Sequence, residues 1–504
     1  MDSKFVLYVG CLLLGMGFYS CVFVTAAITA TPEACCALLS RELPGDVFVS
    51  NSTTWQHENS DFWSTLEILE PTCVFLPNST EKVSQAVKLF TKHDCKFAIK
   101  GGGHSTIPGA ASIHDGILVS PSRLKTTQVN FDEGYIRVGS GALLMDVYAA
   151  LDPHNLSAVI GRYANVGMGL ALGAGISFFS NRDGLAIDNI RNYEVVLANG
   201  EIVNANAKEN HDLLWALKGG NNNFGVVTHF DLDIVKTPGS VYGGQIVYDE
   251  SSFDQVNDVI YDYHTRQAVE GLLTHAMPQY LYFGNLNTTI NATPLVYNSD
   301  VDQLPEILQP WLRIPHRFTT LQKRTYTDLS IHLNVGYGDG LVQGQQVFTV
   351  YADKQFYRDV WFHYRQWLQK HILVPGFVGS HLNMPITPRQ IREGVKKGGN
   401  ALGLEDDGDK VLGVLFFGVT FFNKADSLSI FAGLTAFVQS MEELARQRGI
   451  LHRYKMLTYS GANQAAIASY GEKNVRKLYR VQRKYDPTAV FQRLVPGGQK
   501  LPPT

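Results

Sequence analysis

Residues 97–105 read Phe97-Ala98-Ile99-Lys100-Gly101-Gly102-Gly103-His104-Ser105, a short apolar run followed directly by three glycines and a histidine. The apolar run predicts a strand, and the glycines predict a loop with an exposed backbone. Glycine tolerates positive φ and leaves room for backbone N–H groups to converge on a diphosphate. His104 would then lie within reach of the group that the diphosphate carries. On these residues alone, an ordinary glycine-rich turn with a surface histidine remains the alternative.

A second glycine-rich cluster spans residues 161–177 and includes Gly161-Arg162-Tyr163-Ala164-Asn165-Val166-Gly167-Met168-Gly169. A predicted strand and tight turn follow at residues 188–200, and residues 211–228 contain Lys218-Gly219-Gly220-Asn221-Asn222-Asn223-Phe224-Gly225. In order, spacing and residue type, these stretches resemble the FAD-binding domain of the oxygen-dependent oxidoreductases grouped with vanillyl-alcohol oxidase, in the berberine-bridge-enzyme-like branch of fungal type. The resemblance runs from Pro71 to about Pro238, and a C-terminal signature of that branch is matched by Tyr485, Asp486, Pro487 and Phe491. It covers about half of the chain.

Short predicted strands alternate with helices over the first half of the chain. We expect strands at residues 73–77, 95–100, 116–120, 135–139 and 195–197, and helices at residues 79–92 and 143–151. Such alternation indicates a mixed α+β domain. Beyond it, aromatic and β-branched runs at residues 243–248, 345–351 and 411–417 precede a helical stretch near residues 428–446. This pattern predicts an antiparallel sheet with helices against one face.

The resemblance implies an α+β fold in which a two-subdomain FAD-binding domain of the PCMH type is joined to an antiparallel-sheet substrate domain covered by helices. We divide the chain into a signal peptide at residues 1–27, an N-terminal arm at 28–66, the FAD-binding domain at 67–238, the substrate-binding domain at 239–453, and a berberine-bridge-like segment at 454–504. The last segment is expected to return to the FAD-binding domain, which is therefore discontinuous in sequence.

The resemblance also implies a covalently held FAD. In this family a histidine at the end of the first glycine-rich loop is bonded to the flavin's 8α methyl, and His104 is the matching residue; a non-covalent contact is the alternative. Some relatives add a second bond through a cysteine, but no cysteine follows Cys95, so we expect attachment through His104 only. The expected cofactor-binding residues are His104, Lys100, Gly101, Gly102, Gly103, Ser105, Gly161, Val166, Gly167, Gly173, Ser177, Gly225 and Val227.

Tyr459 is the candidate acid or base. It lies where the family usually has Asn-Tyr followed by Ala-Asp, beneath the substrate face of the flavin. A phenol stabilised by positive charge can take a hydroxyl proton as a hydride departs. Thr458 replaces the usual Asn and Gly461 the Asp, so the family's mechanism does not carry over simply. A structural tyrosine with a satisfied hydroxyl is the alternative.

The composition favours a small-molecule partner. The chain has 504 residues, of which 45% are hydrophobic and 18% charged, and its net charge is −3. This is an ordinary globular composition that offers no global attraction for nucleic acid or an anionic membrane. The sequence contains no metal-binding motif and does not specify an oligomeric state.

The N-terminus predicts entry into the secretory pathway. Lys4 precedes an apolar run over residues 5–24, followed by small residues that favour a cleaved signal peptide over a membrane anchor. Four cysteines remain after it. A vicinal Cys35–Cys36 bridge would be strained, so we expect one of these to pair with Cys73 or Cys95, with the connectivity left open. Glycosylation sequons begin at Asn51, Asn78, Asn155, Asn287 and Asn291.

The leading functional interpretation is a secreted oxidase. It would pass a hydride from a small natural product, alcohol or sugar to covalent FAD, which dioxygen reoxidises with release of hydrogen peroxide. Fungal secondary metabolism is the expected setting, with no stable membrane association after signal cleavage. A flavin-scaffolded cyclase without net redox change is the alternative, and a flavoprotein that has lost catalysis is a third.

Overall fold

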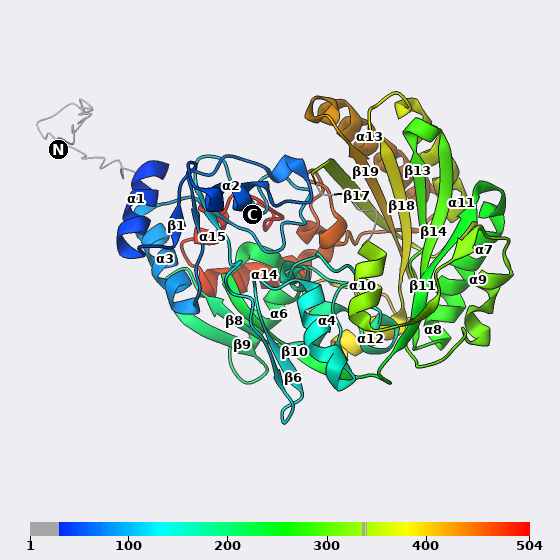
Figure 1. Cartoon of the computed structure of the whole chain (residues 1–504), viewed down its shortest axis with the longest axis horizontal. Coiled ribbons are helices and arrows are strands. Elements are labelled where there is room, and N and C mark those ends of the chain that lie inside the picture. Colours follow the sequence, from blue (N-terminus) through cyan, green and yellow to red (C-terminus); the bar gives the residue numbers. More distant parts are fainter. Residues whose placement is uncertain (1–29, 335–337, 339, 504) are drawn as a thin grey trace, which may run out of the picture.

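The computed structural model describes residues 30–334, 338 and 340–503. The expected signal peptide, residues 1–27, lies outside the described residues. Over the described part, no helix combines the length and apolar character needed to cross a bilayer. The chain forms two halves, one built on two smaller sheets and one on a single large sheet (Figure 1).

The first sheet has the strand order β1-β2-β4-β3, with β2, β4 and β3 parallel. Its strands are β1 (Val47–Phe48), β2 (Cys73–Phe75), β3 (Phe97–Ile99) and β4 (Ile117–Val119). Helix α3 (Thr80–His93) connects β2 to β3, and the Ser79 side chain caps it by accepting from the Lys82 amide. Val83, Val87 and Phe90 on its buried face pack in one core with the sheet. The predicted strands and helix are confirmed here.

Two disulfides tie helix α1 (Pro32–Glu42) to this sheet. Cys35 is bonded to Cys95 and Cys36 to Cys73. The expectation that one cysteine of the vicinal pair is bridged to Cys73 or Cys95 is confirmed, and both cysteines of the pair form such a bridge. Helix α2 (Thr53–Ser60) and the short 3-10 turn η1 (Thr65–Glu67) follow α1 and lead into β2.

The second sheet is antiparallel, with the order β5-β6-β10-β8-β9 and with β7 beside β10. Its strands are β5 (Thr127–Asn130), β6 (Tyr135–Gly139), β7 (Leu156–Ala158), β8 (Ile190–Val196), β9 (Ile202–Asn206) and β10 (Val226–Lys236). Helices α4 (Leu144–Leu151), α5 (Ser180–Asp183) and α6 (His211–Gly220) accompany it. β10 is central because it pairs with three strands. β10 is a strand that was not predicted from the sequence.

The large antiparallel sheet forms the other half, in the order β15-β11-β14-β13-β18-β19-β17-β20, with β12 beside β14 and β16 beside β11. Its strands are β11 (Val241–Asp249), β12 (Thr274–Ala276), β13 (Gln279–Phe283), β14 (Thr288–Tyr297), β15 (Phe318–Thr319), β16 (Gln322–Arg324), β17 (Val342–Tyr351), β18 (Val378–Ile386), β19 (Leu412–Phe421) and β20 (Leu451–His452). The strands predicted from runs near residues 243, 345 and 411 are β11, β17 and β19.

Helices cover the outer face of the large sheet (Figure 1). They include α7 (Phe253–Asp262), α8 (Ala268–Glu270), α9 (Gln309–Arg313), α11 (Lys354–Leu368) and α13 (Ser427–Gln447). Their side chains share one core with outward residues of the strands, such as Phe348 and Phe417. The opposite face contributes Val347, Leu382 and Phe416 to the core of the other half. The large sheet therefore lies between its helices and the smaller sheets, with α10 (Tyr326–Asn334) and α12 (Pro388–Lys396) at its margins.

The C-terminal segment lies in the half that holds the two smaller sheets (Figure 1). Helices α14 (Glu472–Tyr485) and α15 (Val490–Arg493) follow the 3-10 turn η12 (Leu457–Tyr459). The Phe97 amide donates to Leu494 O at 2.8 Å, and the Phe491 ring meets the Phe97 ring edge-on at 6.4 Å. The end of the chain thus packs directly behind the strand that enters the first glycine-rich loop.

Candidate functional site

The two glycine-rich loops meet backbone to backbone. A Cβ placed on Gly102 would lie 2.4 Å from the amide nitrogen of Gly167, and one on Gly167 would lie 2.3 Å from the amide nitrogen of Gly102. No side chain fits at such distances, so this approach requires glycine in both loops. The structure therefore brings together Gly102 and Gly167, which are more than 60 positions apart in the sequence.

Open space and unpaired amides lie beside this contact. A Cβ on Gly169 would meet nothing within 4 Å, and one on Gly101 only the Gly169 nitrogen at 3.9 Å. Within the described part of the chain, the backbone amides of residues 101–106 form no hydrogen bond. Consecutive free N–H groups in a glycine-rich turn make a concavity suited to an anion such as a diphosphate. The residues present therefore fit a dinucleotide cofactor, with Gly101, Gly102 and Gly103 as its cradle.

His104 stands at the end of this cradle against Trp63. The two rings are stacked, with centroids 4.6 Å apart and planes inclined by 15°. Burial lowers the pKa of His104 from 6.5 to about 4, so the imidazole is neutral near pH 7. A neutral imidazole keeps the nitrogen lone pair that a bond to carbon requires. The geometry and protonation state of His104 thus suit the expected attachment.

The Lys100 side chain passes beside Gly103, where a Cβ would lie 3.3 Å from Lys100 Cε, and its ammonium contacts the N-terminal arm. Its Nζ lies 3.4 Å from a Glu58 carboxylate oxygen and 3.2 Å from one of Asp61, and it donates to Glu58 O at 2.9 Å. The ammonium also lies 4.6 Å from the centroid of the Phe62 ring. The charge of Lys100 is therefore used within the scaffold, and a role in cofactor binding stays a prediction.

Ser105 links the cradle to a buried carboxyl group. Glu67 accepts from Ser105 and from the amides of Gly109 and Ala111. Burial raises the pKa of Glu67 from 4.5 to about 7, against the opposing effect of these donors. Because Glu67 belongs to η1, this contact fixes the loop after His104 to the N-terminal arm.

The other expected cofactor residues have different surroundings. A Cβ on Gly173 would lie 2.9 Å from Thr458 Cγ2, so the second cluster packs directly against η12, which ends in Tyr459. Gly161 O accepts from the Tyr148 hydroxyl at 2.7 Å. The remaining expected residues make contacts within the protein. Val166 packs at the core margin, and Ser177 Oγ accepts from the Phe179 amide. Gly225 packs on Val195, and Val227 is buried in β10. Their contribution to FAD binding stays a prediction.

Tyr459 is hydrogen-bonded to an arginine that the sequence analysis did not single out. Arg162 Nη2 donates to the Tyr459 hydroxyl at 2.9 Å and contacts Met384 Sδ at 3.6 Å, while Nη1 lies 3.2 Å from His275 Nε2. Burial lowers the pKa of His275 well below its usual 6.5, and the charge of Arg162 lowers it further, so this imidazole is neutral. In the sequence, Arg162 could have been noticed only because it is a charged residue in a cluster of otherwise small and apolar residues.

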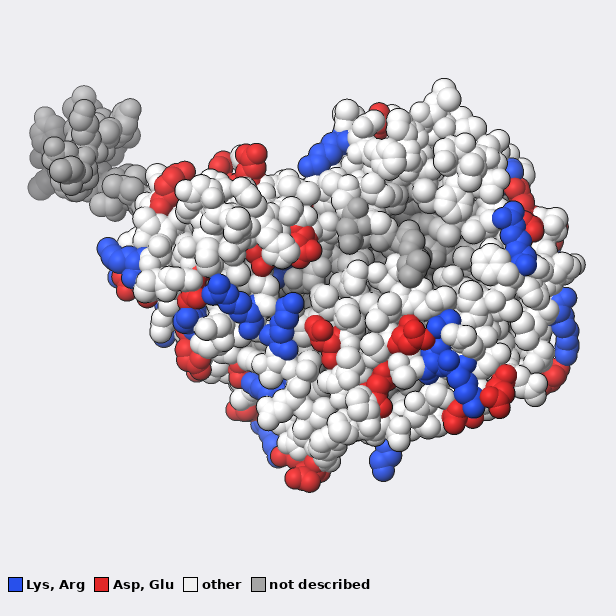
Figure 2. Space-filling view, viewed as in Figure 1, with Lys and Arg blue, Asp and Glu red and all other residues white. Residues whose placement is uncertain are grey.

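Apolar side chains surround this pair. The Phe416 ring meets Tyr459 edge-on at 5.3 Å, and Met277 Sδ lies 3.8 Å from the Tyr163 hydroxyl. Met384 and Phe416 come from β18 and β19, and His275 from β12, so the large sheet supplies one wall of the site. Arg162 and Tyr163 come from the other half. The surface is hollowed between the two halves, and acidic and basic side chains are interspersed on this face (Figure 2).

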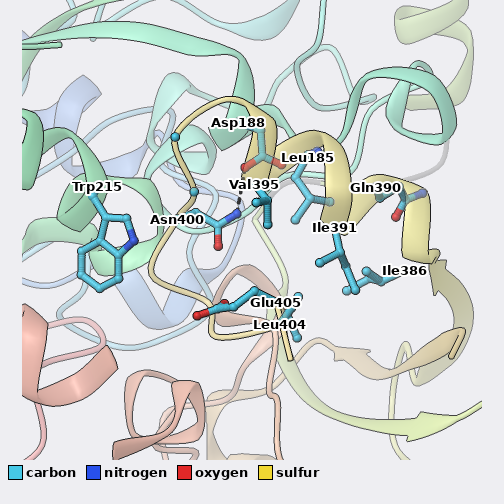
Figure 3. Close-up of a pocket in the computed structure, with 12 residues that line it drawn as sticks. Leu185, Asp188, Trp215, Ile386, Gln390, Ile391, Val395, Asn400, Leu404 and Glu405 are labelled. Atoms are coloured by element: carbon cyan, nitrogen blue, oxygen red, sulfur yellow. Dashed lines mark hydrogen bonds between the residues drawn. The ribbon is translucent and has the colours of Figure 1, made fainter. Parts of the chain in front are cut away.

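A separate hollow of about 290 Å³ lies between α6 and α12. Trp215, Leu185, Ile391 and Asn400 are among its lining residues (Figure 3). Burial raises the pKa of Asp188 at its edge, and this carboxylate accepts from Asn400 Nδ2 at 2.8 Å and from the Leu185 amide at 2.9 Å. The hydrogen-bonding capacity of Asp188, the one buried acidic residue among those that line this hollow, is therefore used by donors of the chain itself.

Four of the five sequons present exposed side chains, namely Asn51, Asn78, Asn155 and Asn287. Asn291 does not. It lies in β14 with a side chain that is 0% exposed, and its Oδ1 accepts from Thr293 at 2.7 Å. A glycan has no room there in the folded chain, so the expectation for Asn291 is corrected.

Known proteins resemble this chain in sequence and in structure. Residues 71–206 match the family described as FAD binding domain. An FAD-dependent monooxygenase of Cochliobolus heterostrophus is 32% identical, over 94% of this chain and 96% of the relative. 6-Hydroxy-D-nicotine oxidase of Arthrobacter nicotinovorans has a TM-score of 0.75 at 18% identity, over 92% of this chain and 98% of its own. Berberine bridge enzyme of Eschscholzia californica has a TM-score of 0.74 at 17% identity, over 93% and 99%.

The two solved structures share the fold of this chain along almost its whole length. The expected α+β architecture is therefore confirmed. The family match covers the segment that contains both glycine-rich loops, so this segment is an FAD binding domain. Given also the 32% identity to an FAD-dependent monooxygenase along nearly its whole length, the chain belongs to the family of FAD-dependent oxidoreductases that contain this FAD binding domain.

Proposed function

We propose that this protein is a secreted oxidase that removes a hydride from a C–O, C–N or activated C–H bond of a small natural product in fungal secondary metabolism. Bound FAD would supply the hydride acceptor and pass the electrons to dioxygen, which yields hydrogen peroxide. The observation that carries the proposal is the Arg162–Tyr459 hydrogen bond, beside the contact between η12 and the second glycine-rich cluster.

Tyr459 would receive the substrate proton. Arginine only donates hydrogen bonds, so the 2.9 Å contact uses the phenol oxygen as acceptor and leaves the phenol O–H free to point elsewhere. The same guanidinium stabilises negative charge on that oxygen. In its phenolate form this oxygen can orient a substrate hydroxyl and accept its proton as the hydride leaves, and the side chain then ends as the neutral phenol.

His104 would hold FAD covalently, and the cradle formed by residues 101–103 would hold the diphosphate. Support comes from the position of His104 at the end of the cradle and from its neutral imidazole. Attachment would be single because all described cysteines are used in two disulfides. These disulfides also support a secretory location, since such bonds persist in oxidising compartments. A shift in mass on deglycosylation and an N-terminus near residue 27 would test secretion.

The test of the proposal is flavin reduction in a Tyr459→Phe variant. A substrate is first found by screening natural products for hydrogen peroxide release. Without dioxygen, Tyr459→Phe should slow flavin bleaching by about 10²-fold or more, the scale of a lost general base, while reoxidation stays unchanged. Tyr163→Phe is the matched control, because it also removes one phenol oxygen from the site but is not expected to exchange protons. Equal reduction rates in wild type and Tyr459→Phe would leave Tyr459 a structural residue.

A monooxygenase is the second candidate, because the Cochliobolus heterostrophus relative carries that name. The two candidates differ in the fate of dioxygen. An oxidase releases it as hydrogen peroxide, whereas a monooxygenase places one of its atoms in the product. Isotopically labelled dioxygen followed by mass spectrometry of the product separates them. Conversion that needs neither dioxygen nor flavin reduction would indicate the cyclase instead.

A further inference from the structure

We propose that Arg162 binds an anionic oxygen of the substrate, and that the substrate is therefore a lipophilic organic acid, either a carboxylate or an ionised enol. This inference rests on the proposed function only in taking the Tyr459 region as the substrate site. It narrows the natural products, alcohols and sugars considered above to compounds that carry a negative charge.

Arg162 is a buried cation without an anion. The residue is 3% exposed, and no aspartate or glutamate in the described part of the chain forms an ion pair with it. Two other cations differ: the buried Lys100 is paired with Glu58, and desolvation lowers the pKa of the partly exposed Lys500 to about 7, so that lysine can lose its charge. A guanidinium cannot, because arginine stays protonated in proteins. The charge at Arg162 is therefore permanent.

The neighbours of Arg162 are neutral and leave donors unused. Nη1 contacts His275, and Nη2 contacts Met384 and Tyr459, which accounts for three of the five N–H groups. The Nε–H and one Nη1–H have no hydrogen-bond partner among the described residues. An unpaired charge in a poorly solvated site is costly, and an anion brought in by a ligand removes that cost.

The side chains around the guanidinium indicate the polarity of the remaining part of the ligand. Met384 Sδ lies 3.6 Å from Arg162 Nη2, and the Phe416 ring meets the Tyr459 ring edge-on, so largely apolar side chains flank the guanidinium and the phenol. A sugar would leave its hydroxyl groups unpaired against such walls and would bring no charge. An acid with an aromatic or polyketide-like body meets both requirements. If the acidic oxygen of this ligand binds Arg162, the ligand carbon next to the acid group would lie close to the Tyr459 hydroxyl, which is where the substrate proton must be taken up.

The test measures binding rather than turnover. Benzoate and cinnamate are titrated into the oxidised, FAD-loaded enzyme, and binding is followed by flavin absorbance and by calorimetry; benzamide and cinnamamide serve as neutral isosteres. The acids should bind about 10- to 100-fold more tightly than the amides, the range for hydrogen bonds to a charged group. Arg162→Gln should abolish this preference and Arg162→Lys should keep part of it. Arg182→Gln is the matched control, because Arg182 is already paired with Asp183 and should leave the preference intact.

Several results would overturn the proposal. One is the absence of saturable binding by both acids in the wild type, and another is an acid preference that survives in Arg162→Gln. A third is a flavin reduction potential that falls in Arg162→Gln while the acid preference stays, since the charge would then serve the flavin. The readout needs no turnover, so a protein that proves to be no oxidase can still confirm the acid site. Conversely, an oxidase with no acid preference would refute this inference alone.

Discussion

Two buried cations next to the glycine-rich loops have opposite surroundings. Lys100, at the start of the first loop, is 2% exposed and faces Glu58, Asp61 and a phenyl ring. Arg162, in the second cluster, is 3% exposed and faces a neutral imidazole, a thioether and a phenol. One charge is neutralised by the chain and the other is not.

The difference in partners distinguishes a cation that stabilises the fold, Lys100, from a cation that is available to a ligand, Arg162. A buried charge with its own carboxylates orders the segments that supply them, here the N-terminal arm and the first loop. A buried charge without them is retained at a cost in stability, and such a cost is typical of groups that act on a ligand. Substitutions at the two positions should therefore change different properties of the protein.

The largest effect on stability is expected for Lys100→Met. It leaves the Glu58 carboxylate buried without its counter-charge, which should cost about 3–5 kcal/mol of unfolding free energy. Arg162→Met removes a cation that has no carboxylate partner, so its effect should be at most about 1 kcal/mol. Thermal unfolding of both variants, followed by circular dichroism, checks the contrast. Adding Glu58→Gln to Lys100→Met should restore most of the loss, whereas equal destabilisation by the two single variants would contradict the comparison.

A smaller change in stability, but a clear change in cofactor retention, is expected for His104→Ala. Wild-type protein precipitated with acid should stay yellow, and a flavin peptide from its digest should contain His104. The variant should still bind FAD through the free amides of residues 101–106, yet release it on precipitation. Absorbance of pellet and supernatant measures the distribution. A colourless wild-type pellet would remove the covalent bond from the account.

The smallest effect is expected for Glu67→Gln, and it depends on pH. In the folded chain burial raises the pKa of Glu67 from 4.5 to about 7. Between these two pH values the unfolded chain has released a proton that the folded chain keeps, so stability falls as pH rises through this window. Glu67→Gln cannot titrate and should lack that part of the decline. Unfolding midpoints measured at pH 5 and pH 8 provide the check, and parallel curves for variant and wild type would refute it.

Local signals in the sequence were sufficient for much of the fold. The N-cap at Ser79 and the apolar spacing of α3 come from neighbouring residues, as do the runs that form β17 and β19. β10 was missed because it follows directly on the Asn221–Asn223 turn, which was considered only as part of a motif. Asn291 was misjudged because a sequon does not show that its strand is covered on both faces.

The candidate site was only half accessible from sequence. The glycine-rich loops are contiguous motifs whose backbone demands are visible in residue type alone. The contact between Arg162 and Tyr459 joins residues 297 positions apart and depends on how η12 packs on Gly173. No periodicity or spacing encodes such a contact. The absence of a carboxylate partner for Arg162 likewise becomes visible only when its neighbours in space are known.

In the proposed reaction, substrate oxidation and flavin reduction are one step, and mixing wild-type enzyme with substrate in the absence of dioxygen tests this. The absorbance of the oxidised flavin should bleach as one product forms per flavin. Admission of dioxygen should then restore the absorbance and release one hydrogen peroxide per product. Product that accumulates over many turnovers without dioxygen, while the flavin stays oxidised, would contradict the account.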